Sequence, residues 1–553
     1  MSDRKKWART LTLHAVLILG CVIFSFPFYW LLTTSMKERT EIFVSPPKWV
    51  PGIPEAVAAS PYATDSVYAE PQMPDDRPLP FAEQDLARVF EMLYEAAAAV
   101  RPERMALLAS LVDGQRYASH GLFTEAAAGL PENLWEGSVE EVGANLAGRV
   151  TADLTDKVLG NVFRGMRIRQ AAVLDRTQRV YTPEEPQTLV AGNAASVSDW
   201  PDSGAQPTEL LAYAFEGGDK AQWQLTMPMP QLEDDFAGIR MPLTGDKSWH
   251  VLNIAVDAPS GHYESAKGYP LADDLTVEWT WMLPEADAGF RKEKDYTDLV
   301  RTGDTAGPGD QLVVTMTLAR QSLFAATMSK FGRAYSEALR YIDFWRYLGN
   351  TVTIVALSII GTLLSCSLVA YGFARLEFPG RDVLFAVLLA TMMLPAQVTM
   401  VPQFLIFRYL GWYNTLIPLW APSFLGSAFF IFMLRQFMKS IPKDLEDAAK
   451  IDGCGYLGIY WRIMLPLIKP ALAAVAIFTF MGAWNNFMGP LIFLNDERLY
   501  PLSLGIYQFR MEHSAEYSMM MAASTLMMLP VLTVFFFAQR YFIQGVTLTG
   551  VKG

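Results

Sequence analysis

The sequence has few cysteines and few histidines, and it lacks several kinds of site. Only 3 of its 553 residues are Cys and 5 are His. The cysteines are Cys21, Cys366 and Cys454, so the region from Gly52 to Trp345 has none and its fold uses no disulfide. The histidines have no metal-ligand spacing, and there is no G-x-x-x-x-G-K-[ST] phosphate loop. We therefore predict no catalytic site, no metal site and no cofactor, and we do not expect the chain to hydrolyse ATP.

Charge is divided unevenly along the chain. Between Gly52 and Trp345 there are 24 Lys and Arg against 44 Asp and Glu, whereas the remainder has 21 basic and 13 acidic residues. An acidic insert within a basic, apolar frame is typical of a membrane protein with one exported domain. The acidic balance gives no support to nucleic-acid binding.

Six uncharged runs are each long enough to cross a bilayer. They are Thr10–Met36, Leu348–Phe373, Val383–Phe407, Tyr409–Leu434, Pro470–Leu494 and Tyr517–Gln539. The first follows a basic start, which is also how a signal peptide begins. It is longer than the usual apolar core of 7–15 residues and no A-x-A-like site follows, so we predict a retained first span.

The distribution of Lys and Arg predicts the orientation of these spans in the inner membrane. With the N-terminus in the cytoplasm, the inside segments hold more basic residues than the short outside segments. The inside segments are Ser2–Arg9, Ala374–Asp382, Arg435–Lys469 and Arg540–Gly553. We therefore expect a multi-pass protein with both termini cytoplasmic and the insert, residues 51–345, extracytoplasmic.

The pattern of apolar residues predicts three parts. Residues 1–50 hold the N-terminus and the first span, 51–345 form the insert, and 346–553 form a membrane domain with five helices. Within the insert, 81–179 has helical spacing, with helices expected around Arg104–Val112 and Val139–Arg169. Residues 180–318 are β-rich. The expected fold class is an all-α polytopic membrane protein with six transmembrane helices plus an α+β insert.

Two tryptophans in the β-rich half, Trp279 and Trp281, are two residues apart and would face the same side of a strand. They could form a platform on which a sugar stacks. We favour the alternative that they belong to the core of a β-sandwich.

A charged stretch from Ile441 to Pro470 separates two of the apolar runs. Six charged residues crowd its first half, and each would cost several kcal/mol at the centre of a bilayer. They are Lys443, Asp444, Glu446, Asp447, Lys450 and Asp452. We therefore predict a polar cytoplasmic loop that forms two short helices broken at Gly453.

This loop resembles the EAA motif of ABC-importer permeases, whose pattern is EAA-x3-G-x9-I-x-LP. The matching residues are Asp447, Ala448, Ala449, Gly453, Ile463, Leu465 and Pro466. The spacing matches throughout, but Asp447 stands where Glu is usual. The resemblance also covers roughly the first 50 residues and Phe344–Gly553. Within it, the chain is most similar to the second permease of maltose-type and glycerol-phosphate-type sugar importers, which depend on binding proteins.

The resemblance implies a type I importer fold and a transport subunit rather than an enzyme. It implies that the seven motif residues dock a cytoplasmic ATPase, which uses the ATP. Further partners would be a second ATPase subunit, a second permease, an extracytoplasmic solute-binding protein and membrane lipid. The residue types agree, since Ala448 and Ala449 let a partner approach closely and Gly453 permits a turn. The alternative is a solvated loop that merely joins two spans.

Polar residues inside the spans are candidates for the solute path. Trp484, Asn485 and Asn486 lie past the middle of the fifth run. Amides can hydrogen-bond sugar hydroxyls and an indole can stack on a sugar ring. They could equally bond a neighbouring helix.

The predicted function is a permease subunit that moves a sugar or related solute by alternating access. The insert would dock the binding protein or capture carbohydrate directly. One rival hypothesis is a membrane-anchored sensor or scaffold that acts through its insert. Another is a secondary transporter. The sequence shows no inverted repeat and no membrane-embedded carboxylate for ion coupling, and both observations count against this hypothesis.

Overall fold

The chain divides into two compact units in a computed structural model. The membrane unit comprises Met1–Gly52 and Phe331–Gly553, and the insert unit comprises Ile53–Lys330. The structure describes residues 2–547 except 45–46, 66, 75–76, 129, 132–133, 136, 177–179, 184–186, 193, 198–207, 216–217, 229–235, 285–295, 304–310 and 513–515.

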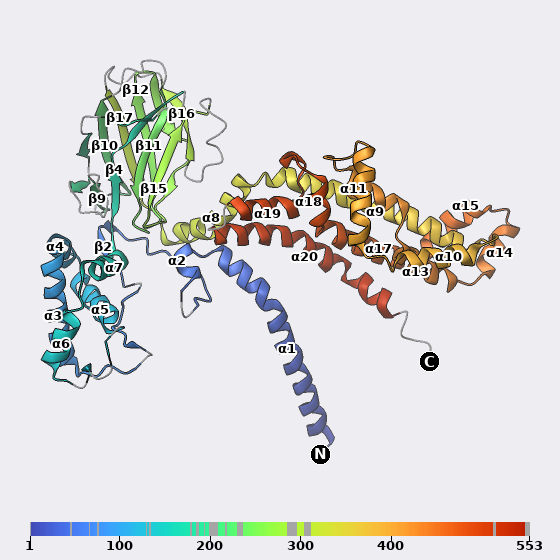
Figure 1. The fold of residues 1–553 in the computed structure, drawn as a ribbon, viewed down its shortest axis with the longest axis horizontal. Helices are drawn as coiled ribbons and strands as arrows, with labels where there is room; N and C mark the ends of the chain where they lie inside the picture. The colour runs from blue at the N-terminus through green and yellow to red at the C-terminus, as the bar shows by residue number, and fades with distance from the viewer. Residues whose placement is uncertain are drawn as a thin grey trace. The chain divides into compact units, whose positions relative to one another are not determined.

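The membrane unit is helical (Figure 1). Its α-helices are α1 (Ser2–Ser35), α2 (Arg39–Ile42), α9 (Phe344–Arg375), α10 (Arg381–Thr391), α11 (Ala396–Tyr409), α12 (Ile417–Trp420), α13 (Ala428–Lys439), α14 (Asp444–Ile451), α15 (Tyr456–Ile459), α16 (Leu465–Leu467), α17 (Lys469–Trp484), α18 (Met488–Phe493), α19 (Leu502–Glu512) and α20 (Tyr517–Thr547). A π-helical turn, η5 (Tyr460–Met464), joins α15 to α16. Helix α8 (Leu323–Tyr341) contains the boundary between the units. Helix α9 is central to this unit, because α13, α17 and α19 all pack against it.

Four described helices are long and apolar enough to cross a membrane. They are Thr10–Ser35, Phe344–Arg375, Ile417–Lys439 and Tyr517–Phe537. A bent pair, Tyr456–Leu467 and Lys469–Trp484, could supply a fifth; its two parts meet at 77°.

The predicted count of six spans is not confirmed. The run Val383–Phe407 is divided between α10 and α11, which are 11 and 14 residues long. Pro395 precedes α11 with an extended backbone, ψ 135°. A proline disfavours helix in the residue before it and cannot donate to the preceding turn, so a break is favoured at this point.

The insert unit begins with a helical part that has its own core. Its helices are α3 (Glu83–Val100), α4 (Pro102–Ala109), α5 (Gly114–Ala127), α6 (Val139–Ala147) and α7 (Ala152–Val162). Each contributes buried apolar side chains at helical spacing, such as Val89, Leu93 and Ala97 on α3. Arg101 and Arg104 both bind Asp156 of α7, at 2.8 Å, and these bonds lower the pKa of that carboxyl.

The rest of the insert is β-rich, as predicted. The strands are β1 (Ala59–Ser60), β2 (Tyr62–Ala63), β3 (Phe163–Arg164), β4 (Met166–Arg169), β5 (Ala172–Asp175), β6 (Val180–Tyr181), β7 (Thr188–Ala191), β8 (Ala195–Val197), β9 (Thr208–Ala214), β10 (Lys220–Pro228), β11 (Phe236–Thr244), β12 (Val251–Ala258), β13 (Gly261–Ser265), β14 (Tyr269–Pro270), β15 (Thr276–Met282), β16 (Tyr296–Gly303) and β17 (Gln311–Ala319). The described strands pair in the order β1-β9-β4-β11-β15-β16-β13-β12-β17-β10-β7. Among these pairs, β15 and β16 are parallel, and β16 then pairs antiparallel with β13.

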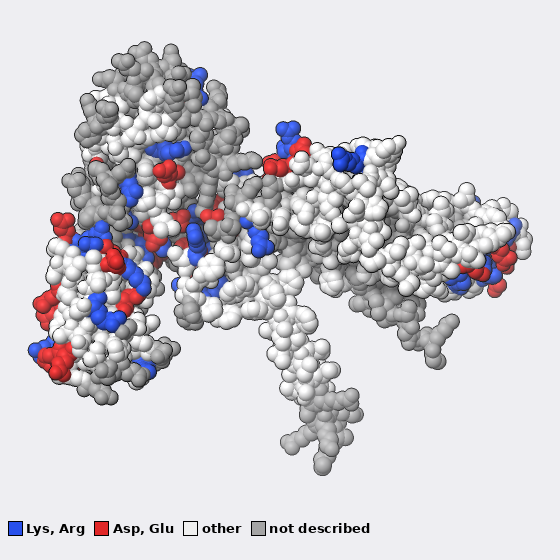
Figure 2. All heavy atoms as spheres, viewed as in Figure 1, with Lys and Arg blue, Asp and Glu red and all other residues white. Residues whose placement is uncertain are grey.

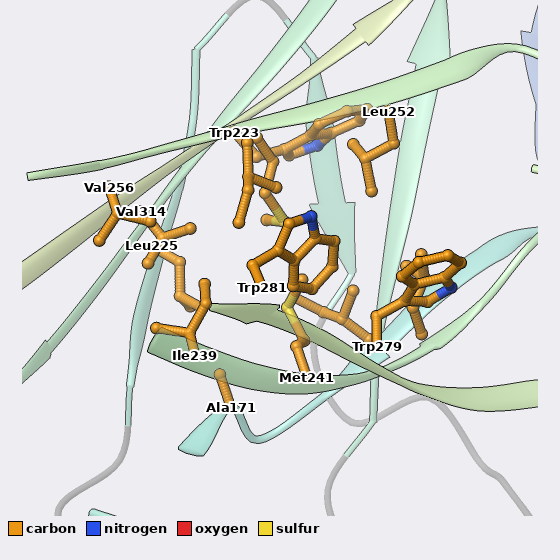
Figure 3. Close-up of a cluster of buried hydrophobic side chains, with 14 of the residues drawn as sticks. Ala171, Trp223, Leu225, Ile239, Met241, Leu252, Val256, Trp279, Trp281 and Val314 are labelled. Atoms are coloured by element: carbon orange, nitrogen blue, oxygen red, sulfur yellow. The ribbon is translucent and has the colours of Figure 1, made fainter. Parts of the chain in front are cut away.

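The two halves of this strand order enclose one apolar core. Trp223 and Leu225 of β10 and Leu252 of β12 face Ile239 of β11 and Trp281 of β15 across it (Figure 3). Trp281 is 1% exposed and Trp279 is 7% exposed. A sugar platform made from these two indoles is therefore excluded, and the sandwich-core interpretation is confirmed.

The predicted helix over Val139–Arg169 is too long. Helix α7 ends at Val162, and Phe163–Arg164 and Met166–Arg169 are strands. Met166 and Ile168 are buried while Arg167 and Arg169 are partly exposed, which is the period of two that a strand requires. The structure therefore places the first strands before residue 180, where we expected the β-rich half to begin.

Candidate coupling site and solute path

The charged loop folds into two helices on either side of Gly453. Helix α14 carries Asp444, Glu446 and Asp447 in its first turn, where negative charge is favourable to the helix dipole. Gly453 has φ +81°, a left-handed conformation that a residue with Cβ adopts only with strain. Its N–H donates to the carbonyl oxygen of Lys450 at 3.0 Å. The chain then turns and α15 begins at Tyr456.

The two adjacent carboxylates of this helix lie in different environments. Asp447, the first motif residue, is exposed and accepts a hydrogen bond of 3.0 Å from Nζ of Lys450, which raises the pKa of that ammonium. Glu446 is buried, and its carboxylate lies 2.8 Å from Nε of Arg375, with the two side chains only 8% and 3% exposed. The Nε–H is not aimed at that oxygen, so the contact is an ion pair rather than an aligned hydrogen bond.

The other motif residues divide between a buried and an exposed set. Ala449 is buried in an apolar cluster against which Ile463 and Leu465 pack. Ala448, Gly453 and Pro466 are exposed. The structure thus brings three of the seven predicted residues together in the core that supports the loop.

Large apolar side chains are exposed beside the charges of this loop. Ile451 is 87% exposed, and the others are Leu445, Tyr456, Leu457 and Trp461. Figure 2 shows charged atoms at the end of the membrane unit that carries α14 and α15, beyond a surface with little charge. An apolar surface mixed with charges fits neither plain solvent nor lipid, and such surfaces mark protein-binding sites.

The sequence argument missed Glu446 and Arg375 as a pair. Glu446 and the buried Ala449 are three residues apart and share one helix face, which was a signal that this carboxylate points inward. Nothing in the spacing names its partner, since Arg375 ends α9, a distant helix in the chain.

The three solute-path candidates lie where α17 ends. The indole of Trp484 is buried, stacks on Phe480 at 5.4 Å and donates to the carbonyl oxygen of Met527 at 3.2 Å. Asn485 is exposed and donates to the carbonyl oxygen of Met481 at 2.9 Å. Oδ1 of Asn486 accepts from the N–H of Gly489 at 3.1 Å. Asn485 is thus the most accessible of the three.

The described residues contain no group of three or more His, Cys, Asp or Glu that could hold a metal ion. Among the described residues, Cys366 is buried and Cys454 is half-buried, and neither forms a disulfide.

Long apolar helices, with a polar helix–turn–helix between two of them, define a multi-pass membrane protein. Residues 322–548 match the family described as binding-protein-dependent transport system inner membrane component. The arabinooligosaccharides transport system permease protein AraQ of Halalkalibacterium halodurans is 36% identical to the chain, over 41% of this chain and 80% of AraQ. The lactose transport system permease protein LacG of Rhizobium radiobacter is 37% identical over 36% of this chain and 72% of LacG.

The chain therefore belongs to the family of binding-protein-dependent transport system inner membrane components. It is a multi-pass membrane protein whose relatives are permeases of carbohydrate ABC importers, which confirms the resemblance inferred from the sequence. A crystal structure of a bacterial ABC transporter that imports the acidic polysaccharide alginate is 26% identical, over 38% of this chain and 79% of that chain, with a TM-score of 0.35.

Proposed function

We propose that this protein is the permease subunit of an ATP-binding cassette importer that moves a sugar or related solute across the inner membrane by alternating access. The observation that carries the coupling part is the exposed apolar surface on α14 and α15, with charges around it. A cytoplasmic ATPase subunit would cover this surface, and ATP-driven closure of the ATPase pair would push on α14.

The rest of the assembly follows from the family and from the charge pattern. A second permease, a second ATPase subunit, an extracytoplasmic solute-binding protein and membrane lipid would complete it. The bias of Lys and Arg supports cytoplasmic termini and an extracytoplasmic insert. The chain uses no cofactor of its own in this proposal, because ATP belongs to the partner subunits. Asn485, with Trp484 and Asn486 behind it, would border the solute path.

The coupling surface is tested by one substitution in the reconstituted transporter. Ile451→Asp places a charge in the apolar surface and should abolish both co-purification of the ATPase subunit and sugar uptake. The matched control is Val190→Asp, which also places an aspartate at an exposed β-branched apolar residue, here in the insert and 55% exposed. The proposal is wrong if Ile451→Asp leaves uptake at the wild-type rate, since coupling could not then run through this surface.

The role of the insert is tested separately with the binding protein. The first hypothesis is that the insert docks the binding protein. Trp279 and Trp281 are buried in the insert, so they cannot form the aromatic platform that direct capture of sugar would have used. The isolated insert has its own buried core. It should retain the binding protein on a column and bind no sugar in calorimetry. Sugar binding without retention would overturn the docking hypothesis. The sensor or scaffold alternative predicts uptake that is independent of α14, which the Ile451→Asp measurement also decides.

A further inference from the structure

Arg375 joins three helices at one end of the membrane unit. It is the last residue of α9, and its side chain is 3% exposed. Its Nη2 donates to the carbonyl oxygens of Met438 and Ile441, the latter at 2.7 Å, where α13 ends. Its Nε lies 2.8 Å from the carboxylate of Glu446 on α14. One guanidinium thus holds the ends of α9 and α13 and the start of α14.

A second arginine makes the reciprocal connection between α9 and α13. Arg435 lies on α13, is 7% exposed, and donates from Nε to the carbonyl oxygen of Phe373 on α9 at 3.2 Å. Its guanidinium carbon lies 3.9 Å from the ring centre of Phe385 on α10. Each helix therefore satisfies carbonyl groups at the end of the other, which fixes their relative position at this end.

The geometry suits positioning better than it suits stability. Arg is a planar, rigid fork that can hold several acceptors in fixed directions. A buried ion pair is weak evidence for stability, because apolar residues of the same volume would often be as stable. Replacing Arg375 and Glu446 together by uncharged residues would leave α14 packed through Ala449 but without the ion pair that links it to the ends of α9 and α13.

We propose that Arg375 is a positioning residue for energy coupling, and that its contacts with Glu446, Met438 and Ile441 make α14 move as one body with α9 and α13. The inference rests on the proposed importer function. A push on α14 then displaces two long helices together. Without the link, α14 moves alone and the push is lost before it reaches the spans.

The test uses the complete transporter in proteoliposomes, with its ATPase pair, sister permease and binding protein. Solute transported and ATP hydrolysed are both measured for two variants. Glu446→Gln keeps a side-chain acceptor beside Arg375, and the double variant Arg375→Met with Glu446→Gln leaves neither charge buried without its partner. We expect both variants to co-purify with the ATPase subunits and to hydrolyse ATP within about twofold of wild type. The solute moved per ATP should fall by about fivefold or more, the size of a typical coupling between sites. A role in folding alone would lower both rates together and leave their ratio unchanged.

The matched control is Arg346→Met, which removes an exposed Arg–Asp pair at the other end of α9. It should leave the transport ratio unchanged. An unchanged ratio in both variants of the Arg375–Glu446 pair overturns the inference. Failure of both variants to assemble also overturns it, since the pair would then be needed for the fold and not for coupling. If the wild-type complex transports no sugar, the proposed function fails instead, so the two failures are distinguishable.

Discussion

The N–H of Cys454 donates to the carbonyl oxygen of Ala449 at 2.9 Å, across the turn that Gly453 makes. This bond satisfies a carbonyl at the end of α14 and sets the direction in which the chain continues to α15. The turn depends on the left-handed backbone of Gly453, around which a Cβ would meet no atom within 4 Å. The requirement at this position is therefore conformational and not steric.

Gly453→Ala should loosen the turn without creating a clash. The left-handed conformation costs a residue with Cβ about 1–2 kcal/mol, which corresponds to a roughly 5- to 30-fold larger open population. Amide hydrogen exchange at residues 449–454 should speed up by that factor. Gly458→Ala is the control, because its Cβ would meet only Cys454 Cβ at 3.9 Å and its backbone is helical. Equal exchange in the two variants would show that the turn tolerates a side chain.

Glu446→Ala should destabilise the membrane unit far more than Asp447→Ala, although the residues are neighbours. Removing the buried carboxylate leaves the Arg375 guanidinium with less compensation, and breaking a buried pair costs about 3–5 kcal/mol. Losing the exposed Asp447–Lys450 pair should cost little, because solvent screens charges at the surface. Thermal unfolding in detergent would show a large fall in Tm for the first and almost none for the second. Similar Tm values would contradict the burial of Glu446.

The helix–turn–helix between Ile441 and Pro470 could be predicted from sequence because its chemistry is local. Charges exclude lipid, and a glycine at a fixed spacing marks a turn. The choice between Glu446 and Asp447 is not local. Both are acidic and both lie in the first turn of α14, and only the position of Arg375 decides which of them is buried.

Secondary structure was predicted correctly where a periodic apolar pattern extends over many residues, and the prediction failed where the pattern covers only a few. Strands β10 and β12 alternate buried and partly buried or exposed residues over 9 and 8 residues, and both lie in the half that was predicted to be β-rich. Strands β3 and β4 have only 2 and 4 residues and directly follow α7, so the helical pattern before them hid the change of period. The run Val383–Phe407 is uncharged throughout, and hydropathy alone did not place the break before α11.

Trp281→Ala should destabilise the insert unit more than a substitution at an exposed residue does. Trp281 is 1% exposed between strands of both halves of the sandwich, and truncating a buried Trp costs about 3–5 kcal/mol. Leu275→Ala, at a residue 62% exposed, should cost less than about 0.5 kcal/mol. Differential scanning calorimetry of the full chain would show the difference as a lower transition for the Trp281 variant only. If both variants melt like wild type, Trp281 does not belong to the core.

His250 should make the stability of the insert fall in mild acid. The side chain is buried, and its Nε2–H donates to the carbonyl oxygen of Val57 at 2.6 Å. Its Nδ1 accepts from the N–H of Gln321 at 3.1 Å. Burial lowers the pKa of this imidazole; the hydrogen bond to Val57 and the charge of Asp246 oppose the shift, and the charge of Arg320 adds to it. A proton on Nδ1 would face the Gln321 N–H, so protonation breaks the hydrogen bond between His250 and Gln321, which follows the end of β17.

The sign follows from the lowered pKa. Below about pH 6.5 the imidazole of residue 250 binds a proton in the unfolded chain but not in the native one. The contribution of His250 to stability is therefore fully present above about pH 6.5. It is lost as the pH falls below that value, at up to about 1.4 kcal/mol per pH unit. His262 acts in the opposite direction, because its bond to Asp257 at 2.5 Å raises its pKa, and its effect is smaller because the side chain is 28% exposed. Hydrogen exchange of the insert in the full chain, corrected for intrinsic rates, should show less protection at pH 5.5 than at pH 7.5. His250→Gln keeps the Val57 bond and should flatten this dependence, whereas His262→Gln should steepen it; a wild-type pH profile in His250→Gln would show that another group controls it.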